Sequence, residues 1–277
     1  MRAIDVSGAR IAVEEVGDGP VALVLHGGLG VDHQLYRSLD PLASSIRLVY
    51  LDHRGNGRST GDAATATMAT WAADAAAVAH DVAGDEPVIV IGHSYGGFIA
   101  QEMAITHGAS VRAVILIATT PGQLGSGEEP APEGPPMPAE FGEMLSVMPA
   151  NDEEYAAGMY RLAPAYLYDT PVEVLRDLMS DTIFCAAAMR RGFEELARWS
   201  AVDRLHEVTS PVLLVAGRHD AFTAWPQSER IASRVNDAEV VILERSGHFP
   251  WLEEPESFFA AVEGWLHRHG LVGHRTS

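Results

Sequence analysis

Basic residues are scarce in this sequence. Its 277 residues include 19 Lys and Arg against 38 Asp and Glu, so the formal net charge at pH 7 is −19. Nucleic acids and anionic membranes attract an excess of positive charge, which this composition does not provide. We therefore expect a small-molecule substrate as the partner, with neither a nucleic acid nor a membrane. The composition predicts no particular oligomeric state.

Cysteine and long apolar runs are also nearly absent. Cys185 is the only cysteine, so no disulfide can form within the chain. No stretch reaches the roughly 18 apolar residues of a membrane-spanning helix, and residues 1–5 begin no run of signal-peptide length. These absences predict a cytoplasmic protein. His267 and His269 lack further ligands nearby in the sequence, so we expect neither a metal nor a cofactor.

Apolar runs alternate with helical patterns along most of the chain. Continuous apolar runs are typical of buried parallel strands, and apolar residues spaced three and four apart are typical of helices. The alternation predicts an α/β fold with a mostly parallel, eight-stranded sheet flanked by helices. The expected strands are residues 3–6, 10–16, 21–25, 47–51, 88–91, 111–118, 211–216 and 239–243. The expected helices between and after them are residues 32–43, 67–83, 95–107, 224–235 and 255–269.

The alternation stops between the sixth and seventh strands. Residues 121–138 are rich in proline and glycine, which predicts an irregular segment. Residues 139–206 are rich in Ala, Met, Leu and Glu and contain no strand pattern. We interpret residues 121–206 as a helical cap inserted after the sixth strand. Residues 1–120 and 207–277 then form the core domain.

A nucleophile is predicted where the fifth strand ends. Four β-branched residues lead into Gly92-His93-Ser94-Tyr95-Gly96, a G-x-S-x-G pattern, and a helical pattern follows. Glycines at both ends permit a turn too tight for Cβ atoms, and such a turn exposes the Ser94 hydroxyl. The motif therefore predicts that Ser94 is a nucleophile. Taken alone, the motif leaves open a glycine-rich turn that carries an incidental serine.

Two later strand ends supply partners for this serine. A serine hydroxyl needs a base to take its proton, and a carboxylate must orient that base. Asp220 follows the strand at 211–216, and His248 follows the strand at 239–243. Functional groups collect at the carboxyl ends of strands in an open parallel sheet. We therefore predict a Ser94, Asp220 and His248 triad, while a helix N-cap at Asp220 and an ordinary loop histidine at 248 are the alternatives.

The third strand ends in a glycine-rich loop that completes the predicted machinery. An oxyanion that develops on an attacked carbonyl needs donors already in place. The N–H of Tyr95, directly after the serine, is one predicted donor. The second donor is the N–H of Gly28, with that of Leu29 as the alternative, and His26 shapes the loop.

Together these motifs resemble the α/β-hydrolase superfamily. The first three are most similar to the proline iminopeptidase branch, whose patterns are H-G-G-P-G, D-Q-R-G-x-G-R-S and G-G-S-[YW]-G-G. The chain departs from that branch at Leu29, His53 and His93 and lacks its Trp-rich segment after the sixth strand. The motifs that carry the resemblance are His26-Gly27-Gly28-Leu29-Gly30, Asp52-His53-Arg54-Gly55-Asn56-Gly57-Arg58-Ser59, Gly92-His93-Ser94-Tyr95-Gly96-Gly97, Gly217-Arg218-His219-Asp220 and Gly247-His248.

The resemblance implies a serine hydrolase that works through an acyl-enzyme. We expect a carboxylesterase or lactonase acting on a small molecule. A proline iminopeptidase is the alternative, because that branch binds the substrate amino group through acidic cap residues, and Glu194 and Glu195 lie in the corresponding region. His26, Gly27 and His93 are further candidates for substrate binding. A non-catalytic receptor for a small ligand on the same fold is the alternative from another class.

Overall fold

The computed structural model describes residues 1–122, 135–136 and 139–272. Within these residues one eight-stranded sheet has the order β1-β2-β4-β3-β5-β6-β7-β8. β1 and β2 pair antiparallel, as do β2 and β4, and all other neighbours are parallel. The predicted α/β fold with a mostly parallel sheet is confirmed. The strands are β1 (Arg2–Val6), β2 (Ala9–Val16), β3 (Val21–Leu25), β4 (Arg47–Leu51), β5 (Val88–His93), β6 (Val111–Ile117), β7 (Val212–Gly217) and β8 (Ala238–Leu243).

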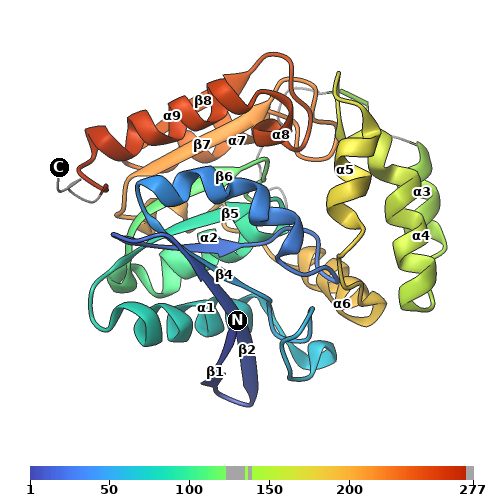
Figure 1. Ribbon diagram of the computed structural model, residues 1–277, viewed down its shortest axis with the longest axis horizontal. Helices are drawn as coiled ribbons and strands as arrows, with labels where there is room; N and C mark the ends of the chain where they lie inside the picture. Colours follow the sequence, from blue (N-terminus) through green and yellow to red (C-terminus); the bar gives the residue numbers. More distant parts are fainter. Residues whose placement is uncertain (123–134, 137–138, 273–277) are drawn as a thin grey trace.

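Helices cover both faces of this sheet. Alternate residues of a strand point to opposite faces. In β3, Leu23 and Leu25 therefore pack with α1 and α2, whereas Ala22 and Val24 pack on the side of η1 and α9. Figure 1 shows α1 and α2 on one side of the central strands β5 and β6, and α8 and α9 on the other. These helices are η1 (Gln34–Ser44), α1 (Met68–Ala83), α2 (Tyr95–Thr106), α7 (Pro226–Ala232), α8 (Pro250–Glu253) and α9 (Pro255–Arg268).

One predicted helix has a tighter winding than expected. The segment predicted as a helix at 32–43 is the 3₁₀ helix η1, and it contains Pro41. Pro41 has no N–H to donate, and its ring crowds the carbonyl group four residues earlier, so it does not fit the interior of a regular α-helix. Leu35, Leu39 and Leu42 of η1 are buried, so the predicted apolar face packs on the sheet as expected.

The segment between β6 and β7 is helical where it is described. Its helices lie beyond one end of the sheet, on the right in Figure 1. Residues 123–134 and 137–138, which make up most of the predicted irregular segment, lie outside the described residues. We keep the name cap for residues 121–206. Its described helices are α3 (Ala139–Ser146), α4 (Asp152–Leu162), η4 (Ala163–Tyr166), α5 (Val172–Met179) and α6 (Ala186–Leu196), and η5 (Leu205–Glu207) spans its end.

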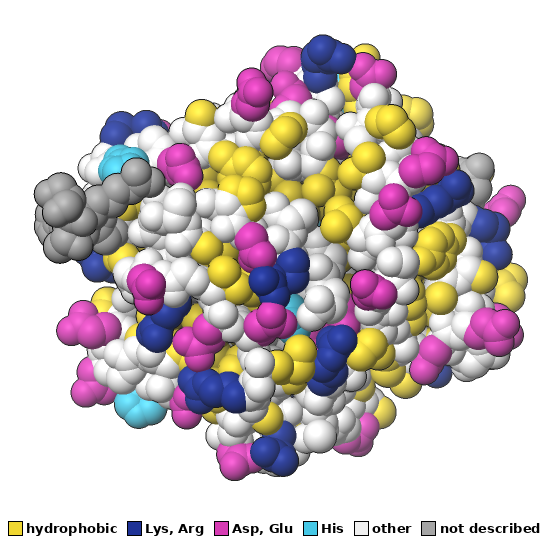
Figure 2. All heavy atoms as spheres, in the orientation of Figure 1, with side chains coloured by type: hydrophobic (Ala, Val, Ile, Leu, Met, Phe, Trp, Pro, Cys, Tyr) yellow, Lys and Arg dark blue, Asp and Glu magenta, His cyan; other side chains and the backbone are white. Residues whose placement is uncertain are grey.

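Charges of both signs are spread over the surface. Figure 2 shows acidic and basic side chains interspersed on one face, with apolar side chains between them. All 19 basic residues of the sequence are arginines. Across the described part of the chain, no helix combines the length and apolar character required to cross a membrane.

Candidate active site

Ser94 lies on a strained turn between β5 and α2. Its φ is +49° and its ψ is −116°, a conformation that costs free energy for any residue with a side chain. The turn is too tight for larger residues at its flanks. A Cβ atom at Gly92 would lie 2.5 Å from the Gly96 carbonyl oxygen, and one at Gly96 would collide with the Leu25 carbonyl oxygen. This is the strand, turn and helix context that the sequence predicted for a nucleophile.

Asp220 and His248 form a buried acid and base pair. His248 Nδ1 donates to Asp220 Oδ2 at 2.8 Å, and Thr223 Oγ1 donates to the same oxygen at 2.6 Å. Burial alone would raise the pKa of Asp220, but the charge and hydrogen bond of His248 and the Thr223 hydrogen bonds lower it to about 2. Asp220 is therefore a carboxylate. It does not cap α7, because that helix begins at Pro226.

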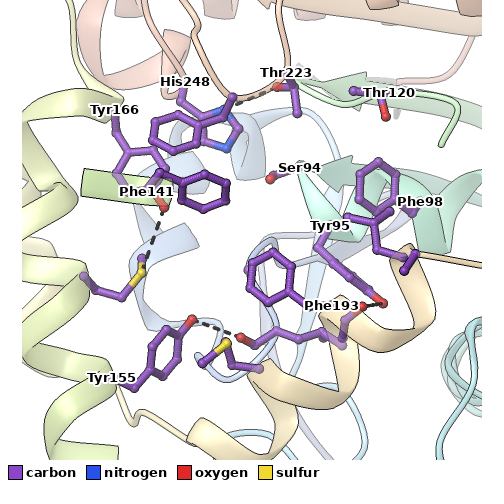
Figure 3. Close-up of a pocket in the computed structure, with 18 residues that line it drawn as sticks. Ser94, Tyr95, Phe98, Thr120, Phe141, Tyr155, Tyr166, Phe193, Thr223 and His248 are labelled. Carbon is purple, nitrogen blue, oxygen red and sulfur yellow. Dashed lines mark hydrogen bonds between the residues drawn. The ribbon is translucent and has the colours of Figure 1, made fainter. Parts of the chain in front are cut away.

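Ser94 and His248 meet at one cavity between the sheet and the cap. The cavity has a volume of about 410 Å³. Figure 3 shows the Ser94 hydroxyl pointing into it, with His248 on one side and Tyr95 on the other. Among the described residues that line it, none is Asp, Glu or Arg. The wall is mostly aromatic and aliphatic: Leu29, Tyr95, Phe98, Phe141, Tyr155, Met159, Tyr166, Met189, Phe193, Leu196 and Phe222.

The predicted oxyanion donors border the same cavity. Gly28, Leu29 and Tyr95 all line it. The N–H of Gly27 donates to Tyr36 Oη at 2.7 Å, and that of Gly30 donates to Asn56 Oδ1 at 2.6 Å. Since their neighbours are engaged on both sides, the N–H groups of Gly28 and Leu29 are the ones this loop can offer to an oxyanion.

A chain of hydrogen bonds links the oxyanion loop to the histidine loop. Tyr36 Oη accepts from Gly27 and donates to His93 Nδ1 at 2.8 Å. His93 Nε2 then donates to the His248 carbonyl oxygen at 2.9 Å. Burial lowers the pKa of His93 well below its usual value, so the ring is neutral and each nitrogen has one role. His93 thus holds the backbone of His248.

None of the five predicted substrate contacts is among the described residues that line the cavity. Among the described lining residues, neither His26, Gly27 nor His93 appears. His26 is buried behind the loop, where its Nε2 accepts from the His53 N–H at 3.1 Å. Glu195 instead pairs with Arg191 at 2.6 Å, and the Glu194 side chain is 61% exposed. Both are turned from the cavity because α6 presents its apolar face to it.

Several contacts in the site carry no clear signal in the sequence. Glu253 Oε1 accepts from the Gly247 N–H at 2.6 Å, beside His248. In the cap, Tyr155 Oη donates to the Leu29 carbonyl oxygen at 3.0 Å. Asn56, which accepts from the Gly30 N–H, could have been noticed, because it lies in the conspicuous motif at 52–59. Thr223, three residues after Asp220, could have been noticed in the same way.

The described residues hold no group of three or more His, Cys, Asp or Glu side chains suited to binding a metal ion.

A family model described as alpha/beta hydrolase fold matches residues 20–255. The chain belongs to this α/β-hydrolase family. The family and the fold predicted from the motifs are thereby confirmed.

Relatives of this α/β hydrolase carry the names of two activities. It is 27% identical to a proline iminopeptidase of Pestalotiopsis fici, over 96% of this chain and 99% of that protein. It is 26% identical to a pimeloyl-[acyl-carrier protein] methyl ester esterase of Aeromonas hydrophila, over 92% of this chain and 99% of that protein. Both activities are hydrolytic, which agrees with the predicted enzyme class.

Solved structures share the fold of this α/β hydrolase. An esterase from Thermogutta terrifontis has a TM-score of 0.76 at 20% identity, covering 97% of this chain and 99% of that one. An esterase from Rhodococcus has a TM-score of 0.78 at 23% identity, covering 96% and 97%. At these identities the likeness concerns the fold.

Proposed function

We propose that this α/β hydrolase is a serine hydrolase that cleaves a carboxylic ester or lactone through an acyl-enzyme. The observation that carries the proposal is the arrangement of Ser94 and His248 on one cavity. With Nδ1 of His248 held 2.8 Å from Asp220 Oδ2, the opposite nitrogen of the ring is left to serve the serine. The positive φ of Ser94 costs free energy, and a turn with no catalytic role would not require a non-glycine residue at this position.

Each part of the site has a step in this reaction. Ser94 Oγ attacks the ester carbonyl carbon while His248 takes the hydroxyl proton. The carbonyl oxygen becomes negative and is stabilised by the N–H of Tyr95 together with that of Gly28 or Leu29. The C–O bond then breaks, and the leaving alcohol receives the proton from His248. Water, deprotonated by His248, hydrolyses the acyl-serine and frees the acid.

The cavity favours an ester over a peptide with a free amino group. An ammonium group removed from water needs an acidic partner, because an unpaired buried charge is costly. Among the described lining residues no carboxylate is available, and Glu195 is already paired with Arg191. A neutral, largely apolar substrate suits such a wall. The esterase relatives support this choice more directly than the proline iminopeptidase relative.

The proposal is tested with Ser94→Ala. We expect wild-type protein to hydrolyse p-nitrophenyl butyrate and to be labelled by a fluorophosphonate probe, and the variant to lose about 10³-fold or more in kcat and all labelling. Circular dichroism would establish that the variant is folded. A variant that retains wild-type turnover would refute Ser94 as the nucleophile.

A substrate panel separates the alternatives. p-Nitrophenyl esters and lactones should be turned over, and prolyl-p-nitroanilide should not. Preferred turnover of the prolyl substrate would favour the iminopeptidase. A folded wild-type protein that is never labelled, yet binds a small ligand saturably, would favour a receptor.

A further inference from the structure

Among the described tyrosines that line the cavity, one has a hydroxyl without a strong hydrogen-bond acceptor. The other tyrosines of the wall are engaged: Tyr95 Oη donates to the Gly192 carbonyl oxygen at 3.0 Å, and Tyr155 Oη donates to that of Leu29 at 3.0 Å. Among the described residues, Tyr166 Oη finds only the Met159 sulfur, at 3.9 Å. A thioether is a weak acceptor, so this hydroxyl retains most of its capacity to donate.

The position of Tyr166 is fixed by its surroundings. Its carbonyl oxygen accepts from the His248 N–H at 2.7 Å, and its ring stacks on Phe222 with centroids 4.3 Å apart. Figure 3 shows Tyr166 beside His248 on the cap side of the cavity, and a dashed line marks its hydrogen bond to the Met159 sulfur. The phenol is therefore held in place while its hydroxyl faces an apolar space.

Keeping this hydroxyl without a strong hydrogen-bond acceptor costs free energy unless a ligand supplies the acceptor. A polar group in an apolar space without a hydrogen bond is unfavourable, and a site built around one rejects ligands that leave it unpaired. A phenylalanine would fill the same volume with no polar atom. Toward a carbonyl or ether oxygen, the hydroxyl acts as a hydrogen-bond donor. Because it is uncharged, it forms no ion pair with a carboxylate or an ammonium group.

We propose that Tyr166 Oη binds a neutral oxygen acceptor in the substrate, so that the preferred esters carry a carbonyl or similar oxygen along an otherwise apolar acyl chain. This assignment rests on the proposed function, because it places the acyl chain in the cavity next to Ser94. It makes Tyr166 a specificity residue. Bond cleavage itself needs only the groups around Ser94.

The test compares matched esters in wild-type protein and Tyr166→Phe. The probes are p-nitrophenyl octanoate and its 5-, 6- and 7-oxo derivatives, which differ from it by one carbonyl oxygen. For at least one oxo position, we expect kcat/KM to fall about five-fold in Tyr166→Phe. The value for plain octanoate should fall by a smaller factor, so that the ratio of oxo to plain ester drops, because only the oxo ester loses a hydrogen bond.

Tyr155→Phe is the matched control. It removes a hydroxyl from the same cavity, but one that holds the oxyanion loop, so it should slow the oxo and plain esters by the same factor. If the ratio of oxo to plain ester is the same in wild type and Tyr166→Phe at all three positions, the assignment is wrong. Failure of wild-type protein to hydrolyse plain octanoate or any other ester, with no fluorophosphonate labelling, would instead overturn the proposed function.

Discussion

Asp220 is the residue whose ionisation the site depends on most directly. Its pKa is lowered to about 2, mainly by the charge and hydrogen bonds of its neighbours against the effect of burial. It therefore stays a carboxylate throughout the pH range in which a hydrolase is assayed. Loss of activity on mild acidification cannot come from its protonation, and must come from another group.

Asp220→Asn should lower kcat for a p-nitrophenyl ester by about 10³- to 10⁴-fold, because the amide no longer holds His248 in the tautomer that serves Ser94. KM should change little, since Asp220 does not line the cavity among the described residues. Steady-state kinetics with the ester used for Ser94→Ala measure both values. A loss of less than about ten-fold would show that Asp220 is not the orienting acid.

At the scale of whole elements, a hydrogen-bonded side chain connects the two segments that flank the site. The histidine loop after β8 and the cap segment after η4 are joined by Glu253 of α8. Its two carboxylate oxygens accept from the Gly247 N–H and the Tyr168 N–H, each at 2.6 Å. Glu253 thus ties the loop that carries His248 to the cap that covers Ser94.

Glu253→Gln should loosen this connection, because the amide nitrogen of glutamine cannot accept from either N–H. We expect kcat to fall about five- to ten-fold, which corresponds to the loss of one hydrogen bond to a charged group. Fluorophosphonate labelling should persist at a lower rate. Glu256→Gln, at an exposed position on α9, serves as the control with wild-type kcat. Equal kcat in wild type and Glu253→Gln would contradict a positioning role for the carboxylate.

The same segments show which features of the site could be predicted from the sequence. That Ser94, Asp220 and His248 lie close together could be expected from the sequence, because each follows an apolar strand and parallel strands bring their carboxyl ends together. The contacts of Glu253 and Tyr166 were not predictable. Both depend on how the cap packs against the core, and a glutamate or tyrosine in a helical segment has no local pattern that distinguishes such a contact. For the same reason, the sequence could not show that Glu195 pairs with Arg191 or that Glu194 is exposed.

At the scale of the whole molecule, the buried histidines link folding to pH. Burial lowers the pKa of His26, and it lowers those of His53 and His93 further. Each is held neutral in the folded state, whereas in the unfolded chain it takes up a proton below about pH 6.5. The unfolded state then binds more protons, so the free energy of unfolding falls as the pH falls below about 6.5.

His33, Asp52 and Asp220 act mainly outside this pH window. Burial would lower the pKa of His33, but its bonds to Asp52 and Glu14 outweigh this and raise it. Its stabilising contribution is complete below about pH 6.5 and is lost only as the pH rises through the raised value. Asp52 and Asp220 have lowered pKa values, so their contributions are present above about pH 4 and are lost below it. Between about pH 6.5 and 5, the neutral histidines therefore dominate.

The free energy of unfolding, measured by urea denaturation in 0.5 M NaCl, should thus fall steadily from pH 6.5 to pH 5. The salt screens the self-repulsion of a chain with net charge −19, which would otherwise weaken on acidification and oppose the trend. In His53→Gln, the amide nitrogen can still donate to the His26 carbonyl oxygen, as His53 Nε2 does at 3.1 Å, but it does not titrate. The slope should then be shallower by up to about 1.4 kcal/mol per pH unit, the value for one proton. A flat profile in the wild type, or equal slopes in the two proteins, would mean that the buried histidines do not set the acid stability of this fold.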